Sequence, residues 1–298
     1  MKDGLPAMTN NYPAVTTDVK NILLVSIGAV CYSTLIIFTR NVEGLDAMSI
    51  AFFRTFFGFL FFSLLMLRFR EPLKIRNYQQ YIWILVILGV VVGMTAALYI
   101  YAIQHTTAAN ASLLVNSAPI YIAFLAPWVL KESRPRYTLA SLLLLVIGVV
   151  LITNIAEIRF DLDSLDGILA GILSGFTYST TFIISRYLKG KVTGFTQTVW
   201  GTGIAAVILL PWALQSDGAV VLSNIGVLIP LGIITLGISS FLYYIALQKI
   251  KAQIVSVIAI LEPVSGALIG LLFFQEIPTF FGLVGILMIL ASIYLISR

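Results

Sequence analysis

Residues 93–132 read GMTAALYIYAIQHTTAANASLLVNSAPIYIAFLAPWVLKE, and residues 237–276 read GISSFLYYIALQKIKAQIVSVIAILEPVSGALIGLLFFQE. The two align without a gap and are identical at ten of forty positions. The identities include Leu98 with Leu242, Tyr99 with Tyr243, Gln104 with Gln248, Ser112 with Ser256, Pro119 with Pro263 and Glu132 with Glu276. Apolar bias alone does not match Tyr, Gln, Pro and Glu at one fixed offset, so the pattern indicates an internal repeat.

The composition around this repeat is that of a membrane protein. Apolar residues make up 59% of the chain and charged residues 10%, whereas a soluble domain carries about 25% charged residues. So few charges cannot cover a surface that faces water, and most of the surface must therefore face lipid. Lys and Arg are scattered between apolar runs instead of forming a patch, which argues against a nucleic-acid partner.

A membrane-spanning helix needs about 20 mostly apolar residues to cross about 30 Å of hydrocarbon. Ten segments qualify, at residues 20–39, 46–67, 79–103, 107–130, 136–154, 166–186, 194–214, 225–247, 252–274 and 279–296. We therefore expect a polar tail at 1–19, a first five-helix repeat at 20–154, an acidic connection at 155–165 and a second five-helix repeat at 166–298. The predicted fold is an all-α integral membrane protein.

The orientation follows from the distribution of positive charge. With a cytoplasmic N-terminus, fifteen of the eighteen Lys and Arg residues lie on the cytoplasmic side, and only Arg40 and Arg159 lie outside. Positive charge gathers on the cytoplasmic side of membrane proteins. Both termini are therefore expected in the cytoplasm, with the protein in the cytoplasmic membrane.

The two halves are predicted to be inverted. Each has five spans, an odd number, so the second half enters the membrane from the opposite side. Tyr32-Ser33-Thr34 matches Tyr178-Ser179-Thr180, and Arg40 outside matches Arg186 inside. Halves related by a pseudo-two-fold axis in the membrane plane are typical of secondary transporters, which alternate access to a site near the midplane.

These features resemble the drug/metabolite transporter superfamily, in its ten-helix EamA-type branch. The resemblance rests on ten spans, the five-plus-five repeat, and a mid-span Pro followed by Glu at the span end in spans four and nine (Pro119 with Glu132, Pro263 with Glu276). It runs from Lys20 to Ser297. It implies transport of a small metabolite, most often export, and leaves the substrate open.

Two charges lie deep within the predicted spans, away from the span ends, where they are expensive and mark functional candidates. Glu262 is at the middle of span nine, and its counterpart in the first half is Ala118, so the repeat does not require the acid. Glu262 could bind substrate and carry a coupled proton, or pack beside Pro263. Arg54, within span two, could bind a substrate carboxylate, pair with Glu262, or bond helix-end carbonyls.

Pro119 and Pro263 each remove a helical hydrogen bond and are expected to kink their spans toward protein or a watery cavity. Polar and aromatic side chains within the predicted spans form a second group of substrate-binding candidates, with ordinary packing as the alternative for each. The group consists of Tyr32, Tyr99, Asn116, Tyr178, Trp200 and Tyr243.

The sequence offers no enzyme site. Cys31 and His105 are the only residues of their types, so no metal cluster is expected, and no Walker-type glycine-rich motif is present. An integral-membrane enzyme or scaffold, the alternative class, would have to use the outer acids Asp161, Asp163 and Asp166, which a solvated loop explains equally well.

The favoured interpretation is a secondary active transporter without cofactors that moves an amino acid or similar zwitterion, most simply outward and driven by protons. A carrier of organophosphates or nucleotide sugars is the alternative within the superfamily. The expected partners are the small-molecule substrate, protons and lipid. The chain is expected to act as a monomer, with a homodimer as the alternative because its glycine spacing (Gly167, Gly171, Gly175) suits close helix contact.

Overall fold

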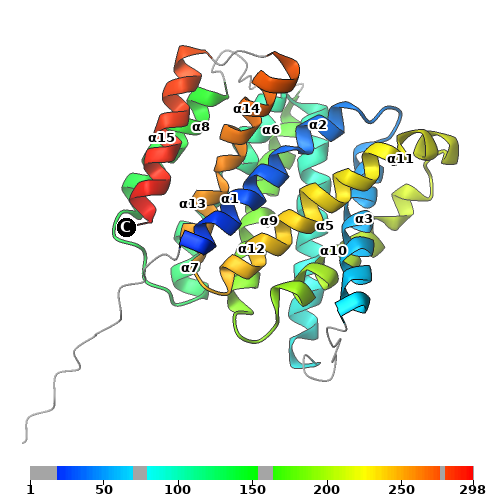
Figure 1. Ribbon diagram of the computed structural model, residues 1–298, viewed down its shortest axis with the longest axis horizontal. Coiled ribbons are helices and arrows are strands. Elements are labelled where there is room, and N and C mark those ends of the chain that lie inside the picture. Colours follow the sequence, from blue (N-terminus) through cyan, green and yellow to red (C-terminus); the bar gives the residue numbers. More distant parts are fainter. Residues whose placement is uncertain (1–18, 70–78, 154–163, 276–278, 298) are drawn as a thin grey trace, which may run out of the picture.

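The computed structural model describes residues 19–69, 79–153, 164–275 and 279–297. Every regular element within these residues is a helix, and the helices form one bundle (Figure 1). The all-α prediction is therefore confirmed. Most of the predicted polar tail and of the acidic connection lies outside the described residues.

In the first half the helices are α1 (Val19–Ser33), α2 (Leu35–Arg40), α3 (Ala47–Phe69), the short η1 (Gln79–Tyr81), α5 (Ile82–His105), α6 (Ala108–Val115), α7 (Ala118–Val129) and α8 (Thr138–Ile152). In the second half they are α9 (Leu165–Tyr187), α10 (Gly194–Ala213), α11 (Gly218–Gly232), the π-helical η4 (Ile233–Ile238), α12 (Ser239–Leu247), α13 (Ala252–Ala259), α14 (Leu261–Phe274) and α15 (Phe280–Ile296).

The helices fit the predicted spans. Among the described residues, eight continuous or broken helices are long and apolar enough to cross a membrane, and the shorter apolar helices α8 and α15 supply the fifth helix of each half. One predicted boundary is wrong: the eighth span begins at Gly218 and not at residue 225. The Asp217 side chain accepts a hydrogen bond from the Ala219 backbone N–H at 2.9 Å, and this cap starts the helix earlier.

The bundle surface is apolar, as a lipid-facing surface must be. Large hydrophobic side chains such as Trp128 (83% exposed) and Leu272 (75% exposed) project outward. The chain is therefore a multi-pass integral membrane protein.

The fourth and ninth spans are broken at matching places. Both α6 and α13 are eight residues long, and they start 144 residues apart in the chain. Each break lies just before a proline, Pro119 in the first turn of α7 and Pro263 in the first turn of α14. Proline has no N–H to donate, which costs nothing in the first turn of a helix. The chain therefore restarts a helix at the two positions where kinks are predicted.

The helices α8 and α15 show that the two halves are inverted. The Ser141 hydroxyl donates to the Ser292 carbonyl at 3.0 Å, and the Ser292 hydroxyl donates to the Ser141 carbonyl at 2.8 Å. Further along α8, a Cβ added to Gly148 would lie 2.9 Å from the Gly285 carbonyl oxygen. As α8 runs forward from residue 141 to 148, its partner position runs backward from 292 to 285. The fifth helices of the two halves are thus antiparallel.

Candidate functional site

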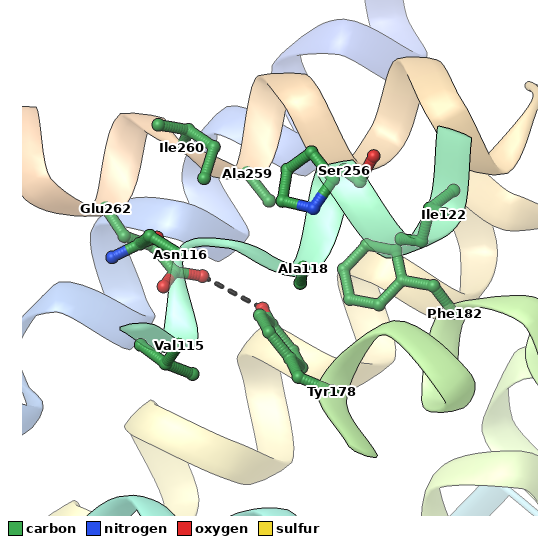
Figure 2. Close-up of a pocket in the computed structure, with 11 residues that line it drawn as sticks. Val115, Asn116, Ala118, Ile122, Tyr178, Phe182, Ser256, Ala259, Ile260 and Glu262 are labelled. Atoms are coloured by element: carbon green, nitrogen blue, oxygen red, sulfur yellow. Dashed lines mark hydrogen bonds between the residues drawn. The ribbon is translucent and has the colours of Figure 1, made fainter. Parts of the chain in front are cut away.

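Glu262 lies at the centre of the bundle, in the first turn of α14, and its carboxylate is held by two tyrosines. Its Oε1 accepts hydrogen bonds from the hydroxyls of Tyr178 and Tyr243, both at 2.9 Å. Figure 2 shows the Tyr178 bond reaching across the cavity from α9 to the carboxylate. The side chain is 6% exposed. The helix break in span nine places this acid at a helix N-terminus, where the helix dipole favours negative charge.

Four tyrosines build the centre of the site. The Tyr32 ring stacks between those of Tyr99 and Tyr178, with centroids 6.5 and 5.8 Å away. Phe182, one turn after Tyr178, lies edge-on to it with centroids 5.0 Å apart, and its ring is 5.5 Å from that of Tyr243. We call these five rings the aromatic wall. It contains both pairs that the repeat matches, Tyr32 with Tyr178 and Tyr99 with Tyr243.

Arg54 lies on the other side of this wall. Its guanidinium carbon is 4.9 Å from the centroid of the Tyr32 ring, and the side chain is 1% exposed. Nε donates to Thr235 Oγ1 at 2.9 Å, and Nη2 donates to the Thr235 carbonyl at 3.1 Å. The predicted alternative of an ion pair with Glu262 is wrong: in the described part of the chain, Arg186 with Glu132 forms an ion pair, and Arg54 does not reach the Glu262 carboxylate.

Thr235 can accept two hydrogen bonds from Arg54 because it lies in the π-helical turn η4. A π-helical turn displaces carbonyls from the usual helical pattern, and such turns gather at functional sites. Close backbone contact brings α3 to this turn, since a Cβ added to Gly232 would lie 2.8 Å from the Arg54 carbonyl oxygen and 3.0 Å from the Gly58 nitrogen. Thr235 is not among the site residues predicted from the sequence. A polar residue within the eighth span was the available signal, but nothing in the sequence linked it to Arg54.

Three small cavities surround the acid and the arginine. One lies between Arg54, Tyr32 and Tyr243. A second is lined by Tyr99, Asn116 and Glu262, and a third by Asn116, Glu262 and Ser256. Figure 2 shows the third, with Asn116 and Glu262 at one end and Phe182 and Ile122 at the other.

Most of the residues singled out in the sequence therefore meet at one place. The residues that line at least one of these cavities are Tyr32, Arg54, Tyr99, Asn116, Pro119, Tyr178, Tyr243, Glu262 and Pro263. Trp200 is the exception: it is half-buried on α10 and lines none of the three cavities. The Asn116 amide donates to the Ser112 carbonyl at 2.8 Å, which leaves its side-chain oxygen for a ligand or water. Ser256 and Phe182, which the sequence analysis did not select, also line the third cavity.

The resulting chemistry is that of two opposite charges across an aromatic wall. The hydrogen bonds to Thr235 use Nε and Nη2 of Arg54, so that Nη1 is available to a carboxylate. Only one oxygen of Glu262 is used by the tyrosines, so that the other is available to an ammonium group. No group of three or more His, Cys, Asp or Glu residues suited to a metal ion occurs in the described residues.

Comparison with known proteins agrees with this architecture. Residues 19–154 and 165–298 each match the EamA-like transporter family. An uncharacterized transporter of Archaeoglobus fulgidus is 33% identical over 277 residues, which cover 91% of this chain and 94% of that protein. The pseudopaline exporter CntI of Pseudomonas aeruginosa is 27% identical over 256 residues, covering 85% of this chain and 87% of the exporter. One crystal structure superposes with a TM-score of 0.79 at 18% identity, covering 93% of this chain and 96% of the other, and shows the same fold.

Proposed function

Because the chain belongs to the EamA-like transporter family, we propose that it is a secondary transporter that exports an amino acid or similar zwitterion by alternating access. The observation that carries this proposal is the placement of Arg54 and Glu262. Their side chains reach the same group of cavities from opposite sides of the tyrosine stack. A zwitterion would place its carboxylate on the guanidinium and its ammonium on the carboxylate.

The aromatic wall suits the remainder of such a solute. Tyr32 and Tyr178 present ring faces between the two charges, and apolar side chains such as Ile122 line the deeper cavity. A doubly charged organophosphate would instead lie beside the buried Glu262 carboxylate and be repelled. This disfavours the organophosphate and nucleotide-sugar alternative.

Glu262 is also the proposed proton carrier. A carboxyl at this depth exchanges its two tyrosine donors for substrate or for a proton as the cavity opens to one side and then the other. Exchange of one proton for one zwitterion would use the proton gradient to drive export. The direction is supported by the name of the relative CntI, an exporter.

The proposed setting is the cytoplasmic membrane, with both chain termini on the cytoplasmic side and the protein acting as a monomer. The charge asymmetry of the connecting segments supports this orientation. Epitope tags at each terminus, tested for access in intact and permeabilised cells, check the orientation directly.

The decisive experiment compares three matched ligands: an amino acid, the amine left when its carboxylate is removed, and the acid left when its amine is removed. Thermal stabilisation of the purified protein should be largest for the amino acid, since a ligand stabilises the state that it binds. Counterflow in proteoliposomes, with and without a pH gradient, should show the same preference. Equal stabilisation by all three ligands would reject the two-charge site.

Two variants test which group of the substrate each charged residue binds. Glu262→Gln keeps the shape of the side chain but not its charge, so we expect it to bind the deaminated acid as well as the amino acid and to ignore the pH gradient. Arg54→Ala should lose the preference for the carboxylate and bind the amine as well as the amino acid. Full affinity and gradient-driven flux in both variants would show that neither residue belongs to the site.

A further inference from the structure

A second site lies at the other end of α7, where this helix and α9 both end. Here an open groove is lined by four basic residues and one acid, together with apolar side chains. The basic residues are Lys131, Arg186, Lys189 and Lys191, and the acid is Glu132. The central site has a single arginine and a single acid, separated by tyrosine rings, so this groove has a different chemistry.

The acid of the groove is already neutralised. Glu132 Oε1 lies 2.6 Å from Nη2 of Arg186 and accepts a hydrogen bond from its Nε at 2.7 Å. Arg186 Nη1 donates to the Leu247 carbonyl at 2.8 Å, which ties α9 to the end of α12. Three ammonium groups therefore face the groove with no acidic partner among the described residues. The groove carries net positive charge at the point where the first half meets the second.

Lys131 occupies an unusual backbone position. Its φ is +54°, in the left-handed region that glycine adopts without strain. Gln275, its counterpart in the second half, has a φ of +56°. The turn is thus a feature of the repeat, whereas the positive charge belongs to the first half alone. A charged side chain kept where glycine would suit the backbone better suggests that the ammonium group is used.

The surroundings favour an amphiphilic anion. Lys191 Nζ lies 3.6 Å from the centroid of the Tyr187 ring, so its charge is held over the groove by a cation–π contact. Val129, in the groove wall, and Trp128, next to it in the chain, are 52% and 83% exposed, on the apolar surface that faces lipid. The groove therefore joins a lipid-facing surface to a cluster of ammonium groups, as basic pockets that bind lipid head groups do.

We propose that this groove binds a phosphate-bearing anion through Lys131, Lys189 and Lys191, and that the phosphate bridges the ends of α7 and α9. An anionic phospholipid head group and a soluble phosphate are the two sources of this chemistry. Either would add a second link beside the Arg186–Glu132 pair and strengthen the contact between the halves at this end of the bundle.

The test uses the full chain in nanodiscs of phosphatidylcholine, with or without phosphatidylglycerol, and in phosphatidylcholine discs with added inorganic phosphate at matched ionic strength. The groove variant is K131G/K189Q/K191Q. The matched control is R134Q/R136Q/K249Q, which removes the same charge from residues that do not line the groove. K131G alone removes one ammonium while relieving the left-handed strain, so loss of binding in it cannot be ascribed to misfolding.

We expect phosphatidylglycerol to raise the melting temperature of the wild type and of the control by about 3 °C or more, and that of the groove variant by much less. K131G should be at least as stable as the wild type in phosphatidylcholine and should gain less from phosphatidylglycerol. Native mass spectrometry should find retained phosphatidylglycerol on the wild type and control only. A comparable rise with inorganic phosphate, abolished in the groove variant, would support the site and assign it a soluble ligand. Equal losses in the groove variant and the control, or no loss in either, would overturn the proposal.

Discussion

Tyr32 and Tyr178 hold equivalent positions in the two halves, and their rings stack with centroids 5.8 Å apart. The pseudo-two-fold axis therefore passes close to this pair. Their surroundings differ, because Tyr32 faces the Arg54 guanidinium while the Tyr178 hydroxyl donates to Glu262. The two halves are related by symmetry, but the pair of charges that they position is not. The axis about which the halves are proposed to rock lies between Arg54 and Glu262.

Removing one tyrosine hydroxyl should weaken the hydrogen bonding that holds the Glu262 side chain in place. Tyr178→Phe and Tyr243→Phe each keep the ring but delete a hydrogen bond to a carboxyl group, worth about 1.5–3 kcal/mol when the acceptor is charged. We expect each variant to change proton-driven transport about tenfold or more, measured as flux in proteoliposomes under a pH gradient. Tyr121→Phe is the control, because its ring packs against Phe176 away from the three central cavities. Wild-type flux in both site variants would mean that these bonds do not matter.

Gly28 gives Tyr243 the space it needs. A Cβ at this position would lie 2.8 Å from Cε1 of Tyr243 and 3.3 Å from the Ser239 carbonyl oxygen. Gly28→Ala should therefore displace the tyrosine and its bond to Glu262, lowering flux and substrate affinity. Gly226→Ala provides the comparison, since a Cβ there meets nothing within 4 Å. The prediction is wrong if both alanine variants transport equally well.

The guanidinium shape of Arg54 should matter as well as its charge. Lysine keeps the charge but cannot donate from two nitrogens to the hydroxyl and carbonyl of Thr235. We expect Arg54→Lys to lose roughly 1–3 kcal/mol of stability, because it leaves the buried Thr235 hydroxyl without its donor and the Thr235 carbonyl with the Ser239 hydroxyl as its side-chain donor. Thermal unfolding in detergent measures this loss, and Thr235→Val, which removes one of the two acceptors, should show a smaller loss in the same assay. A fully stable Arg54→Lys protein would contradict this account of the arginine.

Much of the fold could be predicted because lipid imposes a simple rule on sequence. Because spans must be apolar, the few Tyr, Gln, Pro and Glu residues within them stand out. Their match between the two halves reveals the repeat. The detailed backbone could not be predicted in the same way. Proline indicates a kink, but whether the helix bends or restarts, as it does before Pro263, depends on what can satisfy the freed groups. The π-helical turn lies where Gly58 closely approaches Gly232, a contact between helices that are distant in sequence.

The candidate site could be predicted from the sequence to a similar extent. Glu262 and the four tyrosines could be selected because buried polar groups in lipid need partners, and partners must come from the interior of the bundle. Thr235 could not, since its role appears only when α3 lies against η4. Trp200 was selected as an aromatic residue within a span, but its ring packs at the edge of the core on α10.

Asp46 makes stability depend on pH at the start of α3. Burial raises its pKa, but the hydrogen bonds from the Ser49 hydroxyl and from the backbone N–H groups of Ser49 and Met48 outweigh it and hold the pKa below its ordinary value. A lowered pKa stabilises the folded state above the ordinary value of about 4, and that stabilisation is lost as the pH falls through the folded value. Asp46→Ala should therefore destabilise the protein by about 1 kcal/mol near pH 7 and by less near pH 3. An equal difference between the wild-type and Asp46→Ala melting temperatures at both pH values would exclude this role.

The inverted arrangement itself can be tested with a single disulfide. The hydroxyls of Ser141 and Ser292 lie 2.9 Å apart, so cysteines at these positions are close enough to be bridged. In a Cys31→Ser background, which removes the chain's only cysteine, S141C/S292C should crosslink on mild oxidation in membranes. S141C/I286C should not, because residue 286 lies six positions, about 9 Å, further along antiparallel α15. Parallel halves would bring residue 141 toward its repeat counterpart near residue 285. Crosslinking of the second pair but not the first would therefore mean that the two halves run the same way, and an exchange of conformations between inverted halves could no longer move the site from one face of the membrane to the other.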